Sequence, residues 1–371
     1  MSHSSSSSSS QSESSESLVP LQSKWPCSDP EIVEKVGGSR YDIERELCEN
    51  RATHTFVFLG KEKNPPFRPV AIKVIRVLEQ YLHTPEIDGT TPWDRFCREA
   101  DMWSRFGQAT NVLPLYSPLN QMIDSDRDFR YLGFVMEFSP LGDLSEHIHG
   151  DLIRKLTKSQ KLRFMLGIAN AIQTGDNYGV THGDIKPKNV LLFMERKTLI
   201  PKVMDFGMSA SASGDTHIHG GTPEYMAPEC FTTVSSGTGH ITPSSDIYSL
   251  GVLFYEFITS QYYIPRANSP TEYAERWERC KERQFQAKPE LDVCEKFAEG
   301  MGALLGGMLR KLEDGKRPTI KEAVDSLEAI LEQVERATML NPEADILIRR
   351  GLYRWNDTSA KSPASRSIKT L

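Results

Sequence analysis

The chain has 371 residues, 38% of them hydrophobic and 25% charged, enough for one large domain or two lobes that share a cleft. Its net charge of -6 argues against a nucleic-acid binder that works through a basic surface, and no apolar run reaches the length of a membrane span. The six cysteines lack paired metal-binding spacing and indicate reduced thiols, so we expect a cytoplasmic protein, with the nucleus as the alternative location.

The N-terminal segment is almost entirely serine up to about residue 17. Such a stretch cannot bury enough apolar surface to offset the entropy of ordering, so we predict that residues 1–28 form a disordered leader. It is either a phosphorylatable tail or a solvated extension, and its composition favours the extension. A short helix is predicted for 29–36.

Strands dominate the prediction for the next part of the chain, which becomes extended from about residue 41. Residues 55–60 and 70–78 are rich in β-branched and aromatic side chains, a composition typical of strands. Residues 131–138 indicate a further, buried strand. Between them, apolar side chains recur along one face from 93 to about 106, which predicts a helix.

The second half of the chain is predicted to be mainly helical. The tail from 335 to 371 is polar over most of its length and is predicted to be partly disordered. Helices are predicted over 162–178, 245–259, 297–312 and 320–334, and short strands over 190–193 and 200–204.

Four motifs follow one another along the chain. They are VAIK at 70–73, HGDIKPKN at 182–189, DFG at 205–207 and GTPEYMAPE at 221–229. A single motif of this kind can arise by chance, whereas the ordered set almost never does. The ordered set therefore indicates that the four motifs serve one reaction.

The residue types in these motifs suit the transfer of a phosphoryl group from ATP to a hydroxyl. Asp184 can accept or orient the proton of the attacking hydroxyl, and Lys186 can neutralise charge on the transferring group. Asn189 and Asp205 offer hard oxygen ligands of the kind that Mg²⁺ prefers. We therefore expect Asp184, Lys186 and Asn189 to be catalytic and Asn189 and Asp205 to hold a metal.

Together the motifs resemble the eukaryotic protein kinase family of the serine/threonine type, from about residue 41 to about 334. The resemblance implies an α+β, bilobal fold. A small, β-rich N-lobe would span about 41–138, and a larger, α-helical C-lobe about 139–334.

The same resemblance implies how ATP would bind. Lys73 would contact the α- and β-phosphates and would be held by Glu99. Backbone groups from Glu137 to Ser139 would bind the adenine edge, with Met136 as the gatekeeper behind it. The apolar surfaces on either side of the adenine would come from Val57, Ala71 and Leu191.

Two other residues have structural roles by this resemblance. Asp246 matches the family aspartate that holds the backbone of the catalytic loop. Arg317 matches the arginine that pairs with the last glutamate of the APE sequence, here Glu229. A buried pair of this kind is costly to break singly, because the surviving charge is left unpaired.

The chain departs from the family pattern at two places. Gly183 replaces the arginine that normally meets a phosphate on the activation segment, so we expect activity not to depend on phosphorylation there. No glycine occurs from Leu47 to Thr55, where the glycine-rich loop should lie. Because glycines let backbone N–H groups approach the phosphates closely, nucleotide affinity is expected to be weakened.

Two functions remain open at this point. One is an active serine/threonine kinase that uses ATP and Mg²⁺ on protein substrates. The other is a pseudokinase, an interaction module with little or no catalysis, which the glycine-free loop favours and the complete set of charged residues opposes. The sequence indicates neither a nucleic-acid partner nor a membrane span, and it does not reveal the oligomeric state.

Overall fold

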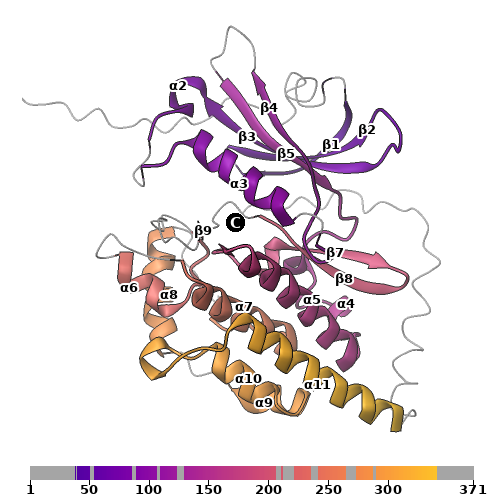
Figure 1. Cartoon of the computed structure of the whole chain (residues 1–371), viewed down its shortest axis with the longest axis vertical. Coiled ribbons are helices and arrows are strands. Elements are labelled where there is room, and N and C mark those ends of the chain that lie inside the picture. The colour runs from indigo at the N-terminus through magenta and orange to yellow at the C-terminus, as the bar shows by residue number, and fades with distance from the viewer. Residues whose placement is uncertain are drawn as a thin grey trace, which may run out of the picture.

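The computed structural model describes residues 38, 40–50, 54–85, 89–106, 109–122, 129–205, 210–211, 221–234, 241–264, 273–286 and 290–340. The serine-rich leader, the helix expected at 29–36 and the tail beyond residue 340 lie outside these residues. The described chain folds into a β-rich lobe and a helical lobe, one above the other in Figure 1.

The upper lobe is built on a five-stranded antiparallel sheet. The predicted strands at 55–60, 70–78 and 131–138 are present, each with ends that differ by one or two residues. Neighbouring strands follow the order β1-β2-β3-β5-β4. The strands are β1 (Tyr41–Asn50), β2 (Thr55–Glu62), β3 (Pro69–Leu78), β4 (Leu115–Met122) and β5 (Phe129–Glu137).

The predicted helix of this lobe is α3 (Pro92–Phe106), preceded by the single turn α2 (Glu79–Leu82). Its apolar face lies against the sheet, because the rings of Phe96 and Trp103 contact Phe134 of β5 at centroid distances of 5.1 and 5.6 Å. This packing fixes which way the helix faces, and it turns Glu99 toward β3.

The lower lobe is organised around α7 (Pro243–Thr259), whose residues 245–257 are all buried. Both α5 and α7 start with a capping box, from Thr157 and Thr242, which satisfies the first free N–H groups. The other helices are α4 (Asp151–Arg154), α5 (Lys158–Asn177), α6 (Pro228–Val234), α8 (Tyr273–Gln286), α9 (Leu291–Phe297), α10 (Met301–Met308) and α11 (Ile320–Leu340).

Short strands frame the segment between the two lobes. The predicted strands near 190 and 200 form an antiparallel hairpin, β7 (Val190–Glu195) and β8 (Thr198–Val203). A second pair joins β6 (Val180–Thr181) to β9 (Ala210–Ser211). The residues between β6 and β7 are thereby fixed at both ends.

One helix prediction was wrong. The stretch from 297 to 312 is not continuous, since α9 ends at Phe297 and α10 begins at Met301. Gly300 between them has φ of 86°, a left-handed conformation that interrupts an α-helix and that glycine adopts without a steric cost. The last helix was predicted too short, because α11 continues to Leu340.

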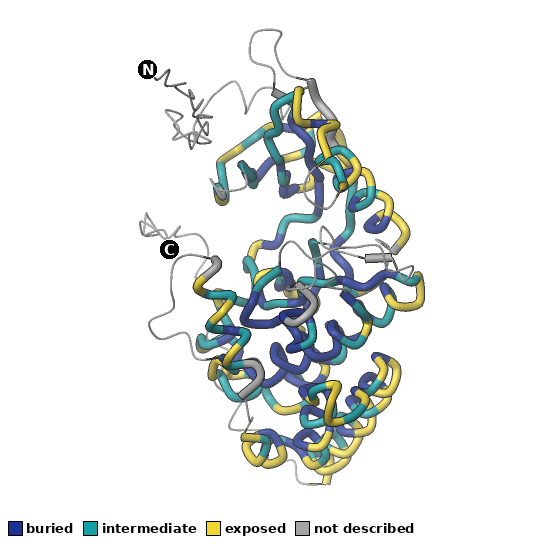
Figure 2. The backbone as a smooth tube through the Cα atoms, turned by 90° about the vertical axis from the view of Figure 1, so that its left-hand side faces the viewer, coloured by how far each residue is buried: buried dark blue, intermediate teal, exposed yellow. Residues whose placement is uncertain are grey.

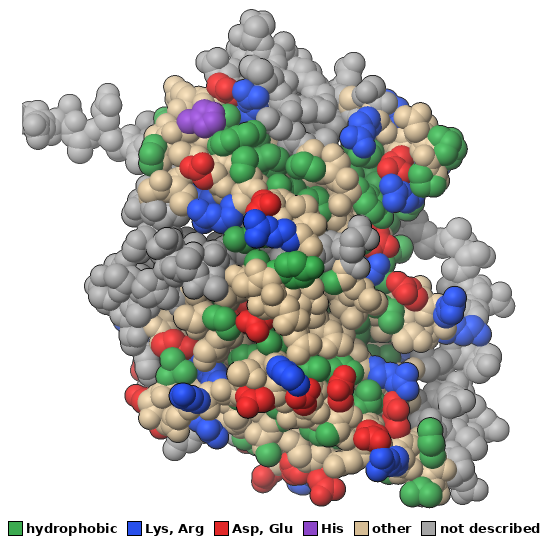
Figure 3. Space-filling view, viewed as in Figure 1, with side chains coloured by type: hydrophobic (Ala, Val, Ile, Leu, Met, Phe, Trp, Pro, Cys, Tyr) green, Lys and Arg blue, Asp and Glu red, His purple; other side chains and the backbone are tan. Residues whose placement is uncertain are grey.

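Burial and charge are distributed as expected for two packed lobes. Figure 2 shows the buried positions gathered inside each lobe, with exposed positions at strand turns and along the outward faces of helices. On the face in Figure 3, acidic and basic side chains are interspersed.

Within the described ranges, no helix combines the length and the apolar character needed to cross a membrane.

Candidate active site

The loop after β6 is anchored on the first turn of α7. Asp246 accepts hydrogen bonds from the backbone N–H groups of His182 (2.7 Å) and Gly183 (2.9 Å). Burial raises the pKa of Asp246 to about 6, although His182 and these two N–H donors oppose the shift. The carboxyl group holds the loop and is itself isolated from water, being 3% exposed.

This buried carboxyl group predicts a pH-dependent stability. Its pKa is higher in the folded chain, about 6, than the ordinary value of 3.8, so the folded state retains a proton that the unfolded state loses. Its contribution to stability is therefore complete below pH 4 and is lost as the pH rises to about 6. We expect the unfolding free energy of the wild type, relative to Asp246→Asn, to fall by roughly 3 kcal/mol over this range.

Denaturant unfolding of both proteins at several pH values measures this difference. Asp151→Asn, on the exposed face of α4, is the matched control. An unfolding free energy of the wild type that increases relative to that of Asp246→Asn as the pH rises would contradict the prediction.

His182 ties the loop to the end of β8. Its Nδ1 accepts the backbone N–H of Asp184 at 3.2 Å, so the neutral ring carries its proton on Nε2. Nε2 then donates to the carbonyl of Met204 at 3.1 Å. Because Met204 precedes Asp205, the imidazole couples the positions of the two aspartates.

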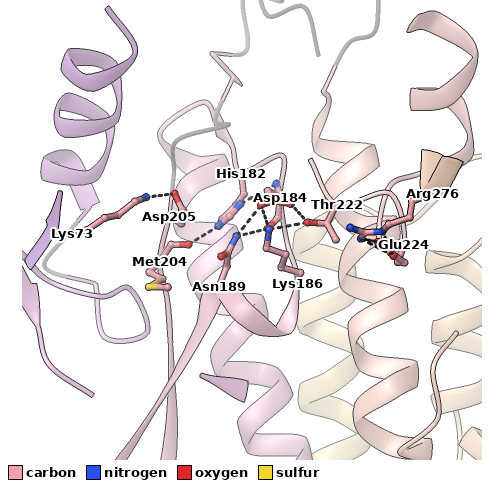
Figure 4. Close-up of polar contacts among 10 residues, drawn as sticks. All are labelled: Lys73, His182, Asp184, Lys186, Asn189, Met204, Asp205, Thr222, Glu224 and Arg276. Carbon is pink, nitrogen blue, oxygen red and sulfur yellow. Dashed lines mark hydrogen bonds and ion pairs between the residues drawn. The ribbon is translucent and has the colours of Figure 1, made fainter. Parts of the chain in front are cut away.

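Asp184 lies at the centre of a compact polar network (Figure 4). Lys186 Nζ donates to its Oδ2 at 2.5 Å, and Thr222 Oγ1 donates to its Oδ1 at 3.0 Å. Lys186 also donates to Thr222 Oγ1 at 2.8 Å, and Asn189 Nδ2 donates to Asp184 Oδ2 at 3.2 Å. The fold therefore brings together all three predicted catalytic residues, with Thr222, which the GTPEYMAPE motif contains, in contact with two of them.

Lys73 of β3 reaches across to Asp205 (Figure 4). Its Nζ lies 3.0 Å from Asp205 Oδ1 and 3.6 Å from Glu99 Oε1 of α3. Burial by itself would lower the pKa of Lys73, but the carboxylates of Asp205 and Glu99 outweigh it and raise the pKa. Burial opposes ionisation of Asp205 too, yet Lys73 holds the pKa of that carboxyl below its usual value. Both groups are charged and paired at the position expected for the phosphates.

Glu99 differs from Asp205 in its surroundings. It is 7% exposed, and burial raises its pKa against the opposing effect of Lys73. The ammonium group of Lys73 is closer to Asp205, which takes the hydrogen bond. Asp205 itself has φ of 68°, a left-handed conformation that costs a residue other than glycine about 1–3 kcal/mol and that is common at functional sites.

Asn189 and Asp205 form a donor set that fits Mg²⁺. The N–H of Met204 donates to the carbonyl of Asn189 at 2.9 Å, so the residue before Asp205 is fastened to the predicted partner ligand. The Asn189 amide nitrogen donates to the backbone carbonyl of Asp184 at 2.8 Å, so this hydrogen bond does not use the amide oxygen. The described part of the chain contains no group of three or more His, Cys, Asp or Glu side chains arranged to hold a metal, here or at another place. One carboxylate and one amide oxygen suit a hard cation that shares its shell with phosphate.

The residues predicted to surround the adenine lie at the junction of the lobes. Met136 is buried at 4% exposure and pairs across the sheet with Ala71, while Val57 and Leu191 are half-buried. Ser139 Oγ donates to the carbonyl of Leu192 at 2.6 Å, which fastens the lobe connector to β7.

Glu137 has a side-chain contact that the sequence did not reveal. Its Oε2 lies 2.6 Å from Lys202 Nζ of β8, and that ammonium group also lies 4.4 Å from the centre of the Phe193 ring. The pair joins the start of the lobe connector to the lower lobe. Because 65 residues separate its members, no local pattern could have indicated it.

The structure locates both departures from the family pattern. Gly183 has φ of 81°, so the position that lost its arginine is one where a side chain would be strained. The β1–β2 hairpin is paired up to Asn50 and Thr55, which leaves four residues for the glycine-free turn. Residues 51–53 of this turn, Phe206 and Gly207 lie outside the described residues.

Comparison with known proteins agrees with this geometry. The family model described as "Protein kinase domain" matches residues 55–327. Similar proteins include the probable serine/threonine-protein kinase gdt9 of Dictyostelium discoideum, 28% identical over 282 residues, which are 67% of this chain and 16% of that protein. Serine/threonine-protein kinase atg1 of the same organism is 32% identical over 156 residues, 41% of this chain and 21% of atg1.

A third relative comes from a plant. The probable LRR receptor-like serine/threonine-protein kinase PAM74 of Arabidopsis thaliana is 34% identical over 148 residues, 38% of this chain and 16% of that protein. The matched regions thus span about a sixth to a fifth of the length of these relatives. Since the family model covers well over half of the chain and the polar network lies inside the matched region, the chain belongs to the protein kinase family.

Proposed function

We propose that this chain is an active serine/threonine protein kinase that transfers the γ-phosphoryl group of ATP, with Mg²⁺, to hydroxyls of protein substrates. One observation carries the proposal: the Asp184 carboxylate contacts Lys186, Thr222 and Asn189 directly, while Lys73 and Asp205 are paired nearby. Phosphoryl transfer depends mainly on positioning and charge neutralisation, so a complete set of charged residues in mutual contact is what it needs.

The contacts support a proposed task for each residue. The Asp184 carboxylate would accept the proton of the substrate hydroxyl, with Thr222 orienting one of its oxygens. Lys186, between Asp184 and Thr222, would face the developing charge on the phosphoryl group. Asn189 and Asp205 would hold Mg²⁺, which supplies charge neutralisation on the phosphate oxygens when bound, and Lys73 would bind the remaining phosphates.

The acceptor is expected to be serine or threonine. Lys186 and Thr222, the residue types that serine/threonine members carry, contact each other at 2.8 Å beside Asp184. The purified chain should label itself and a general protein substrate with radioactive ATP and Mg²⁺. Acid hydrolysis of both products should then release phosphoserine and phosphothreonine. A predominance of phosphotyrosine would contradict the assignment.

The pseudokinase remains the second candidate because of one feature, the glycine-free β1–β2 turn. A turn without glycine keeps backbone N–H groups further from the phosphates, and each charge-assisted hydrogen bond lost weakens ATP binding by roughly tenfold or more. The labelling assay decides between the two functions. The predicted independence of activation-segment phosphorylation concerns Ser209, Ser211, Ser213 and Thr216, whose side chains lie outside the described part of the chain.

A further inference from the structure

An ion pair with a buried carboxylate lies next to the catalytic network. Arg276, on α8, donates three hydrogen bonds to the Glu224 carboxylate, at 3.1, 2.7 and 2.7 Å (Figure 4). The Glu224 side chain is only 6% exposed, whereas that of Arg276 is 31% exposed. The arginine therefore compensates a carboxylate that is largely removed from water, an arrangement in which the loss of one partner is costly.

Glu224 belongs to a short turn, residues 222–225, which we call the acceptor turn. The N–H of Tyr225 donates to the carbonyl of Thr222 at 2.9 Å, so Glu224 lies inside a closed hydrogen-bonded ring. The first residue of that ring, Thr222, contacts both Asp184 and Lys186 through its hydroxyl. Because the two residues belong to the same closed turn, a displacement of Glu224 should also displace Thr222.

The other end of the acceptor turn is fixed to the central helix. The hydroxyl of Tyr225 donates to Glu256 at 2.8 Å, and Ser249 Oγ donates to the carbonyl of Tyr225 at 2.8 Å. Both partners lie on α7, whose residues 245–257 are buried. Arg276, by contrast, comes from α8, a helix at the periphery of the lobe.

Helix α8 rests on the lobe through a small apolar contact. Trp277 packs against Phe231 of α6 with a ring-centroid distance of 4.8 Å, and Cys280 is buried. Most of the other side chains described on this helix are half-buried or exposed. Among the described contacts, the Arg276–Glu224 pair is thus a direct polar link between a peripheral helix and the turn that completes the catalytic network.

We propose that Arg276 is a positioning residue for phosphoryl transfer, which holds Thr222 against Asp184 and Lys186 by anchoring Glu224. This inference rests on the proposed kinase function for its catalytic consequence, although the anchoring can be measured without it. Arg276 touches neither Asp184 nor Lys186 in the contacts described; it acts through Glu224.

Arg276→Ala should lower kcat while leaving the KM for ATP nearly unchanged. Without its three hydrogen bonds the buried carboxylate moves toward water, and the acceptor turn moves with it. Misplacement of a positioned group by about 1 Å costs up to about a hundredfold in rate, so we expect kcat to fall by roughly tenfold to a hundredfold. Lys73 and Asp205 have no contact with the acceptor turn among the described interactions, which is why ATP binding should be retained.

Three further variants separate anchoring from general damage. Arg276→Lys keeps the positive charge but not the bidentate geometry, so its kcat should lie between those of the wild type and Arg276→Ala. Combining Glu224→Gln with Arg276→Ala removes the charge that needs compensation, and it should recover part of the lost kcat. Arg163→Ala breaks the Arg163–Glu335 pair between α5 and α11, far from the turn, and is the matched control.

Hydrogen exchange provides the readout that needs no activity. Peptides covering residues 221–227 should exchange faster in Arg276→Ala than in the wild type, and at the wild-type rate in Arg163→Ala. If the wild type transfers no phosphate, the proposed function fails, and faster exchange still upholds the anchoring. If Arg276→Ala folds and neither exchange nor kcat changes, or only the melting temperature falls, the inference is overturned.

Discussion

Asp205→Ala is expected to abolish phosphoryl transfer while the chain remains folded. The variant loses the carboxylate proposed to hold Mg²⁺ and the group to which Lys73 donates at 3.0 Å. Removal of one strong electrostatic group from a site of this kind costs from about a hundredfold to about a hundred-thousandfold in rate. The fold should survive because Lys73 keeps Glu99 as a partner at 3.6 Å, and because Asp205 contributes no apolar packing.

Incorporation of radioactive phosphate, measured beside circular dichroism and a melting curve, tests this result. Asp205→Asn should be equally inactive, because it keeps the shape of the side chain but not its charge. Asp151→Ala, on an exposed helix, should behave as the wild type in all three measurements. Equal labelling by wild type and Asp205→Ala would overturn the enzymatic function and favour the interaction module.

Arg317→Ala should produce the largest loss of stability. The Arg317 side chain is fully buried and donates to both oxygens of Glu229, at 2.6 and 2.9 Å. It also donates to the carbonyls of Ser244 and Arg310, and its guanidinium lies 4.9 Å from the centre of the Tyr248 ring. Its removal takes these contacts away from Glu229 and from the two carbonyls, and we expect a loss of about 3–5 kcal/mol.

Denaturant unfolding gives this free energy. Arg163→Ala breaks an exposed arginine–glutamate pair in the same lobe and should cost no more than about 1 kcal/mol. Replacing both members, with Glu229→Gln and Arg317→Met, should recover much of the loss, since no buried charge then lacks a partner. Similar losses of unfolding free energy for Arg317→Ala and Arg163→Ala would show that the buried pair contributes no more to stability than the exposed pair.

Much of this molecule follows from local sequence patterns. The strands at 55–60 and 70–78 were predicted from their β-branched and aromatic composition, and the helix at 93–106 from its apolar stripe. These signals depend only on neighbouring residues, as do those for the strand at 131–138 and the helices around 162–178 and 245–259. The motifs also predicted that Asp184, Lys186 and Asn189 work together, because they lie within six residues of one another. The family and its two-lobed α+β fold were predicted for the same reason.

The structure alone decided contacts between residues far apart in the chain. The Glu137–Lys202 pair joins residues 65 apart and the Glu224–Arg276 pair joins residues 52 apart. The local sequence around each of these four residues does not indicate which distant residue it pairs with. An ion pair depends on how packed elements place two charges in space, which one-dimensional periodicity does not contain. The break at Gly300 escaped prediction similarly, because the apolar pattern continues through it and only the backbone conformation of the folded chain, with φ of 86°, ends the helix.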